Sequence, residues 1–160
     1  MSGVVKAWAP MVREVLDEHD PFGDIPPWVV LSLIQVESNG NPYAHRKNSQ
    51  FYGLLQIGKA IAQEGGEKDA SPYWGQARMS VEAFVGWCHR YSHIHNYDPE
   101  YIAMGWKGGV GTVKTYIRKT EKGGRYDALK VWLNEKRWRT GIYIDRFWRA
   151  SENYIDEFWE

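Results

Sequence analysis

Three features of the sequence predict an all-α fold. Apolar residues recur at helical spacing in most segments, helix start and stop signals separate these segments, and only residues 39–52 form a long polar, turn-rich stretch. There we expect a loop or a small irregular hairpin around residues 43–53. The 160-residue chain contains no repeat, low-complexity tract or linker, so we expect a single domain over residues 1–160.

The N-terminal part of the chain is expected to form two helices. The first has one apolar face, made of Val5, Trp8, Val12 and Val15. It should end before Asp20-Pro21, because the residue before a proline avoids the helical conformation. The second opens at Ile25-Pro26-Pro27, since proline is tolerated in a first turn. Gly40 is expected to take its left-handed cap, and Pro42 cannot continue the helix.

The rest of the chain is expected to be helical, with short connections. Gly65-Gly66 ends a short helix, and Asp98-Pro99 supplies an N-cap followed by a proline at the first helical position. One face of a further helix carries Val81, Phe84, Val85 and Cys88. The expected helices are Gly53–Gln63, Met79–His95, one beginning after Asp98, Thr112–Arg118, Tyr126–Leu133 and Tyr143–Phe158.

Composition limits the classes of partner. The 20 basic and 20 acidic residues balance, so no strong field draws the chain to nucleic acid or to an anionic membrane. Cys88 is the only cysteine, which excludes an intrachain disulfide and favours synthesis in a reducing compartment. The nine tryptophans and ten tyrosines are a strong excess of aromatic residues for a chain of this length. Core packing and a saccharide-binding groove both account for such an excess.

The N-terminus does not resemble a secretory signal. Pro10 interrupts it and charged residues soon follow, and no apolar stretch approaches the length that spans a bilayer. We therefore expect a protein made in the cytoplasm without a signal peptide and without membrane insertion.

Glu37 is the most informative position in the chain. Helical spacing places it on one face with Val30, Leu33 and Ile34, in the last turn of the second helix. Burial and the negative end of the helix dipole both disfavour the charged carboxylate, so we expect a raised pKa for Glu37. A glutamate that stays protonated near neutral pH suits general acid catalysis. The other interpretation is a rim glutamate whose stem packs while its head reaches water.

Three glycine-marked segments carry polar and aromatic groups. They read E-S-N-G-N-P from Glu37, G-L-L-Q-I from Gly53, and G-W-K-G-G-V-G-T-V from Gly105; a fourth, looser block is T-G-I-Y-I from Thr140. Together they resemble the lytic transglycosylases of the soluble (SLT) type, related to the goose-type lysozymes. The first two blocks at this separation are specific, and the third and fourth are weak alone. The resemblance covers residues 26–144 and implies a lysozyme-like, all-α fold.

The resemblance implies cleavage of the β-1,4 bond between N-acetylmuramic acid and N-acetylglucosamine in peptidoglycan. Glu37 would act first as acid and then as base, and the muramoyl 6-hydroxyl would close a 1,6-anhydro ring. This scheme needs one carboxylate rather than the usual pair. The partner is then the glycan strand, and the chain is expected to be a monomer, alone or attached to a virion. Lack of a signal peptide favours a phage lysis protein (endolysin) or a virion component acting on the bacterial cell wall.

The other site residues follow from the same blocks. Gln56 matches the glutamine that lines the family's cleft, while Leu54 and Leu55 are expected in the core and Ser38 is expected to brace the helix end. Trp106 and Lys107 stand where the family has Tyr and Asn, so this chain lacks the family's phenol hydroxyl and amide at these two positions. Lys107 would favour ionised Glu37, opposing burial. The remaining candidates for contact with substrate are Ser49, Tyr52 and Tyr143, of which Tyr143 would supply the missing phenol hydroxyl.

Two alternatives to the transglycosylase stay open. A lysozyme-type hydrolase would need a second carboxylate to position water, and the candidates are Glu64, Glu67, Asp69 and Asp98. Asp98 already has a structural role as an N-cap. A non-catalytic glycan-binding or structural virion module on the same fold is the second alternative, because fold does not guarantee activity.

No cofactor or metal is expected. His89 and His93 are spaced to share a helical face and His95 follows closely, yet no acidic residue completes an H-E-x-x-H pattern. Gly108-Gly109-Val110-Gly111 lacks the following G-K-[ST] of a phosphate loop, so we interpret it as a turn between helices.

Overall fold

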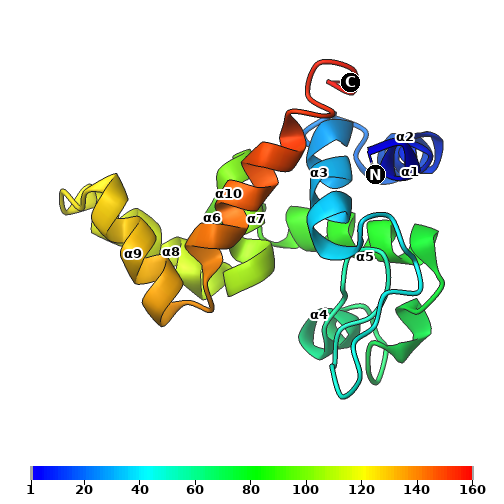
Figure 1. Cartoon of the computed structure of the whole chain (residues 1–160), viewed down its shortest axis with the longest axis horizontal. Coiled ribbons are helices and arrows are strands. Elements are labelled where there is room, and N and C mark those ends of the chain that lie inside the picture. Colours follow the sequence, from blue (N-terminus) through cyan, green and yellow to red (C-terminus); the bar gives the residue numbers. More distant parts are fainter. Residues whose placement is uncertain (1, 160) are drawn as a thin grey trace. The chain divides into compact units, whose positions relative to one another are not determined.

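A computed structural model describes residues 2–159 and confirms the all-α class. Ten α-helices and one 3₁₀ helix are present in these residues. In chain order they are α1 (Ser2–Lys6), α2 (Ala9–His19), α3 (Pro27–Ser38), α4 (Lys59–Glu64), η1 (Ser71–Tyr73), α5 (Ala77–Arg90), α6 (Ser92–His95), α7 (Pro99–Gly108), α8 (Val110–Glu121), α9 (Tyr126–Lys136) and α10 (Thr140–Ser151) (Figure 1). None of the described helices is both long and apolar enough to cross a bilayer.

The described chain divides into two compact units. The first runs to His89 and includes the stretch from Ala150 onward, and the second is Arg90–Arg149. The expectation of one domain over residues 1–160 stays a prediction.

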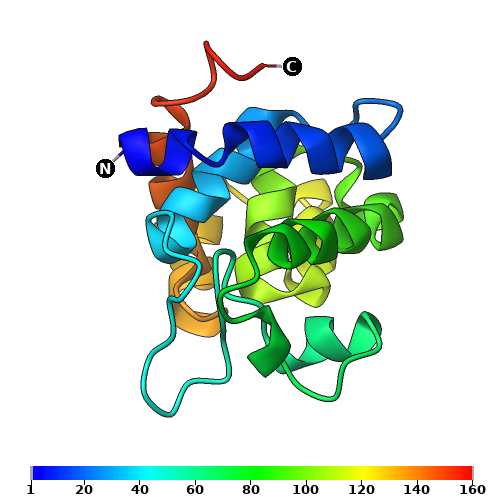
Figure 2. The same ribbon diagram turned by 90° about the vertical axis from the view of Figure 1, so that its right-hand side faces the viewer.

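Helix α3 is the centre of the first unit. Pro26 is extended and cannot donate a backbone hydrogen bond, so the helix begins at Pro27 as the sequence predicts. Its first eight residues, 27–34, are all buried, because the segment is apolar on every side and not along a single stripe. Both α1 and α2 contact it (Figure 2). The end of the chain also joins this unit, since the Trp28 N–H donates to the Phe158 carbonyl at 2.9 Å.

The expected first helix is two helices, which corrects the prediction. The chain leaves α1 after Lys6 and enters α2 at Ala9, with a turn at Ala7–Trp8. Pro10 is the reason, because it has no N–H to bond to the carbonyl of Lys6 and its ring clashes there. Three of the four residues of the expected apolar face, Val5, Val12 and Val15, are nevertheless fully buried, while Trp8 is half-buried.

Three other helix boundaries differ from the prediction. Residues 53–58 are not helical and α4 begins at Lys59, because Gly53 and Gln56 have φ values of 85° and 52°, which no α-helix accepts. The expected helix Met79–His95 breaks at Tyr91 into α5 and α6. Helix α10 ends at Ser151 and the chain continues in turns. In place of a hairpin around residues 43–53, one antiparallel bridge joins Tyr52 to Ile57.

The second unit is built from α6 to α9 and most of α10. Asp98 caps α7 as predicted, since its Oδ1 accepts from the N–H groups of Glu100 (2.9 Å) and Tyr101 (3.1 Å). A single residue, Gly109 with φ 87°, separates α7 from α8, which confirms a turn between helices at the glycine-rich segment. The core of this unit contains Met104, Val113, Tyr116, Leu129, Leu133 and Ile144.

Tyr154 ties the last segment of the chain to α3. Its side chain is fully buried, and its hydroxyl donates to Oε1 of Gln35, which also accepts from Nδ2 of Asn153 at 3.4 Å. Burial raises the pKa of Tyr154 to about 12, because ionisation would leave a phenolate out of water.

We expect Tyr154→Phe to lower the free energy of unfolding by about 1 kcal/mol at neutral pH, the typical worth of one hydrogen bond. Urea unfolding measures this value. An unfolded tyrosine ionises near pH 10, so the contribution of neutral Tyr154 is fully present below that pH and is lost as pH rises towards about 12. The difference between the two proteins should therefore shrink over that range. Equal stability at neutral pH would contradict the role of Tyr154.

Candidate functional site

Glu37 lies in the last turn of α3, as predicted. Val30, Leu33 and Ile34 on the same helical face are fully buried, whereas the Glu37 side chain is half-buried. The apolar face of α3 therefore reaches the surface at Glu37. The cap differs from the prediction: Asn39, with φ 53°, takes the left-handed cap position and its N–H donates to Gln35 at 3.1 Å. Asparagine tolerates this conformation better than most residues, which explains why glycine is not required there.

Ser38 joins the end of α3 to the segment that contains Gln56. Its Oγ donates to the Leu54 carbonyl at 2.7 Å and lies 3.2 Å from the Ile34 carbonyl, and it accepts from the Gly40 N–H at 3.2 Å. The expectation that Ser38 braces the helix end is confirmed. The residue next to Glu37 thus holds the G-L-L-Q-I segment in place.

That segment is a tight turn with a buried apolar side. Leu54 and Leu55 are fully buried, which confirms them as core residues. Gly53 can only be glycine: its φ is 85°, and a Cβ there would lie 2.6 Å from the Tyr73 carbonyl oxygen. Nε2 of Gln56 donates to the carbonyls of Ala44 (2.9 Å) and Gly53 (3.0 Å). The amide nitrogen of Gln56 therefore clamps the loop 39–57, in addition to any contact with a ligand that its oxygen makes.

Ser49 and Tyr52 come together at a hollow of about 320 Å³ in the first unit. The Tyr52 ring stacks on His45 with centroids 3.9 Å apart, and Oγ of Ser49 accepts from the Phe51 N–H at 3.0 Å. The hollow is lined by Ser49, Gln50, Tyr52, Lys59, Lys68, Asp69, Ala70 and Ser71. Tyr52, which lines the hollow, is two residues before Leu54, whose carbonyl accepts from Ser38. Two residues of chain span at most about 7 Å, so the hollow lies near the turn that Ser38 holds.

Two exposed aromatic rings form a fixed pair that the sequence did not reveal. Tyr43 and Trp74 are 58% and 51% exposed and meet edge to face, with centroids 5.0 Å apart. Nε1 of Trp74 donates to the Tyr43 carbonyl at 3.0 Å, and the Gly75 N–H donates to Pro42 at 2.8 Å. A Cβ at Gly75 would lie 2.7 Å from the Tyr43 ring. In the sequence, turn residues beside Tyr43 and Trp74 indicate that each lies in a loop. No sequence pattern indicates that the two rings contact each other.

The other predicted site residues belong to the second unit. Trp106 is at the end of α7 and is only 9% exposed, while Lys107 beside it is exposed. The ammonium of Lys107 lies 5.9 Å from the centre of the Tyr143 ring, a cation–π distance, and Tyr143 on α10 is 7% exposed. The structure therefore brings Lys107 and Tyr143 together. Whether Tyr143 offers its hydroxyl to a substrate stays a prediction.

Among the candidate second carboxylates, Asp69 has the best-defined environment. Its Oδ1 accepts from both the backbone N–H (2.9 Å) and the hydroxyl (2.6 Å) of Ser71. These hydrogen bonds, and secondarily the charges of Lys68 and Lys59, lower the pKa of Asp69. Asp98 has its capping role in α7.

Two of the three histidines, His89 and His95, have separate partners. His89 on α5 donates through Nε2 to the His19 carbonyl at 2.8 Å, and His95 on α6 accepts from the Tyr97 N–H at 2.9 Å. The break at Tyr91 also removes the helical register that was expected to align His89 with His93. Within the described part of the chain, no group of three His, Cys, Asp or Glu side chains could hold a metal ion.

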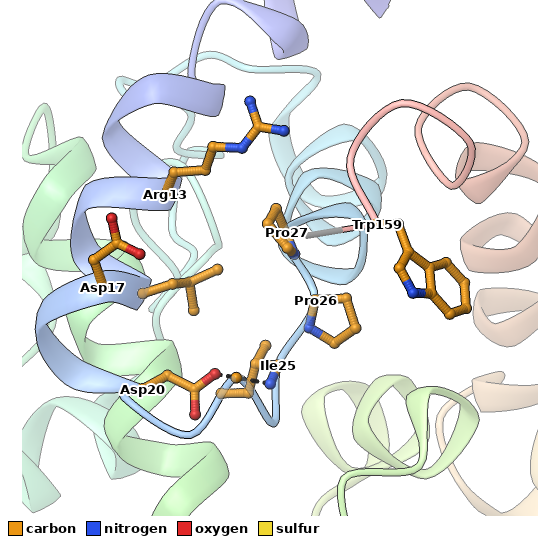
Figure 3. Close-up of a pocket in the computed structure, with 9 residues that line it drawn as sticks. Arg13, Asp17, Asp20, Ile25, Pro26, Pro27 and Trp159 are labelled. Carbon is orange, nitrogen blue, oxygen red and sulfur yellow. Dashed lines mark hydrogen bonds between the residues drawn. The ribbon is translucent and has the colours of Figure 1, made fainter.

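A second hollow, of about 440 Å³, lies at the opposite end of α3 (Figure 3). Pro26 and Pro27 line it, and Asp20 on its edge accepts from the Ile25 N–H at 2.8 Å. Glu37 lies ten positions after Pro27 along α3, which is about 15 Å at 1.5 Å per residue. This hollow therefore does not serve the chemistry expected of Glu37.

Comparison with protein-family models and with curated proteins finds no match for the chain. The resemblance to lytic transglycosylases therefore rests on the motif residues alone.

We expect Ser38→Ala to lower the free energy of unfolding by about 1–2 kcal/mol, because the alanine leaves the partly buried Leu54 carbonyl without its donor. Hydrogen exchange should also become faster in residues 53–57.

Ser32→Ala is the matched control on the same helix. Oγ of Ser32 bonds only to the Trp28 carbonyl one turn back, so its loss leaves the helix hydrogen bonds intact. If both variants lose the same stability, Ser38 has no special role as a brace.

Proposed function

We propose that this protein is a peptidoglycan lytic transglycosylase in which Glu37 is the acid and base. One observation supports this most strongly: a half-buried glutamate ends a buried helix, and the next residue, Ser38, holds the G-L-L-Q-I turn at 2.7 Å. The two sequence blocks that resemble the family are therefore in direct contact. A pair of motifs that matched by chance would have no reason to share a hydrogen bond.

The proposed reaction begins with protonation of the glycosidic oxygen by Glu37. The bond from this oxygen to the muramoyl anomeric carbon breaks, with assistance from the neighbouring N-acetyl group. Glu37, now a carboxylate, takes the proton of the muramoyl 6-hydroxyl, whose oxygen bonds to the anomeric carbon. The proton returns to Glu37 and no water is consumed, so one carboxylate is sufficient.

The position of Glu37 favours the first step. The carbonyl end of a helix disfavours negative charge, and partial burial acts in the same direction, so both favour the protonated carboxyl that a general acid needs. The backbone that carries Glu37 is also fixed, because the buried part of α3 and the Ser38 contact hold it. A catalytic group must be held in this way if proton transfer is to be efficient.

Aromatic surfaces in the first unit support a glycan substrate. The exposed Tyr43–Trp74 pair and the stacked Tyr52–His45 pair both offer rigid rings with polar edges. Such rings suit the apolar faces and the hydroxyl-bearing edges of sugars. On this proposal the partner is the glycan strand of the bacterial wall, which a phage lysis protein or virion component would attack.

A lysozyme-type hydrolase is the second candidate, and Asp69 is the observation that favours it. A hydrolase that positions water needs an ionised carboxylate, and the hydrogen bonds from Ser71 lower the pKa of Asp69. Asp69 also lines the same hollow as Ser49 and Tyr52.

We expect Glu37→Gln to reduce cleavage of purified peptidoglycan by about 10²- to 10⁴-fold, the usual contribution of general acid–base catalysis. Affinity for the glycan should stay near that of the wild type, since the amide keeps the size of the side chain. Mass spectrometry of the released muropeptides measures both rate and product, and wild-type products should carry 1,6-anhydro ends.

Glu152→Gln is the control, because Glu152 is exposed in the same unit and is expected to leave cleavage unchanged. Products that end in reducing muramic acid, heavier by one water, would favour the hydrolase. If the wild type binds glycan without cleaving it, and Glu37→Gln changes nothing, the chain is a binding module.

We expect Trp74→Ala to weaken binding of peptidoglycan glycan by about three- to tenfold, within the range measured for aromatic contacts. Phe22→Ala is the matched control, because Phe22 is 90% exposed in the same unit. Binding assays with the non-cleaving Glu37→Gln protein separate affinity from turnover. An equal loss in both aromatic variants would rule out a specific role for Trp74.

A further inference from the structure

Two lysines face the hollow beside Tyr52 without a partner of their own. Lys59 begins α4, and Lys68 precedes the turn that contains Asp69. Among residues 2–159, neither ammonium group has a hydrogen-bond or ion-pair partner. Each therefore keeps its N–H donors for solvent or for a ligand.

Asp69 is the third charged group in the hollow, and Ser71 already holds it. Both the N–H and the hydroxyl of Ser71 bond to Oδ1 of Asp69, which fixes the carboxylate in the turn. The charges of Lys68 and Lys59 both contribute to lowering the pKa of Asp69, so both ammonium groups lie within electrostatic reach of it. The hollow thus has two positive charges and one negative charge, a net charge of +1.

The size and shape of the hollow favour a side group over a run of sugars. Its volume of about 320 Å³ is at the small end of the range for ligand pockets. Its lining includes the aromatic residue Tyr52 and the polar residues Ser49 and Gln50. A group with an apolar stem and an anionic end matches these surfaces.

We propose that this hollow binds a carboxylate of the peptide attached to muramic acid, through Lys59 and Lys68. The inference rests on the proposed function, since it concerns which part of peptidoglycan the same unit recognises. Tyr52 beside the two lysines favours a peptide carboxylate on an aliphatic stem over a phosphodiester, which has the same single charge. Residues Lys59 and Lys68 would then determine specificity for peptide-bearing glycan and would take no part in bond cleavage.

Binding of the full chain to two forms of uncross-linked glycan strands, immobilised on a solid support, tests the proposal. Both forms are stripped of phosphate polymers, and one is also treated with an amidase that removes the peptides. With the Glu37→Gln protein, we expect tighter binding to the peptide-bearing form. The double variant Lys59→Gln/Lys68→Gln should lose about three- to tenfold in affinity for that form and nothing for the peptide-free form, and added salt should reduce the difference.

A matched control has the same change in net charge at other sites. Lys47 and Lys122 are exposed and lie outside the hollow, so Lys47→Gln/Lys122→Gln should bind both forms as the parent does. Asp69→Asn keeps the oxygen that accepts from Ser71 and removes the negative charge, so it should bind the peptide-bearing form about two- to fivefold more tightly.

Several outcomes would overturn the inference: equal binding of both forms by the parent, equal losses in the two lysine double variants, or weaker binding by Asp69→Asn. The assay is repeated with peptidoglycan that keeps its phosphate polymers. If the Lys59→Gln/Lys68→Gln variant binds more weakly than the parent only to this material, the ligand is a phosphate, which would also overturn the inference. Cleavage of the peptide-free form by the wild type reports on the proposed function separately, because it needs neither lysine.

Discussion

The hydrogen bond from Ser38 to the Leu54 carbonyl is the contact on which the rest of the site depends. It joins the end of α3 to Leu54 in the G-L-L-Q-I turn, 16 residues further along the chain. Serine is suited to this position because its short hydroxyl reaches the Ile34 and Leu54 carbonyls and also accepts from Gly40. A helix end has unsatisfied carbonyl groups, so a side chain that bonds outward from it fixes the direction of the following loop.

Helix starts and caps could be predicted from the sequence where one or two neighbouring residues determine them. The start of α3 at Pro27 and the Asp98 cap each follow from one or two neighbouring residues. The turn at residues 53–58 could not be predicted in this way, because Gln56 adopts its left-handed conformation with the help of a bond to Ala44, 12 residues away. Helical propensity favoured a helix there, and the long-range contacts override it.

The candidate site also combines features that local sequence predicts with features that depend on long-range contacts. The placement of Glu37 beyond three buried residues, and the bracing role of Ser38, follow from helical spacing and motif position. The Tyr43–Trp74 pair joins residues that are 31 positions apart, and no periodicity connects them. The left-handed cap fell on Asn39 and not on Gly40, because both residue types tolerate positive φ and only the surrounding bonds decide between them.

The first unit is made of two pieces of chain that are far apart in the sequence. Helix α3 receives part of its cover from Tyr154 and Phe158, which the ribosome adds long after α3 itself. During synthesis the helix that carries Glu37 therefore lacks this cover until both residues have been added. A truncation just after Arg149 would keep every residue of the candidate site and would still uncover that helix, so shortened forms of this protein are poor material for studying its chemistry.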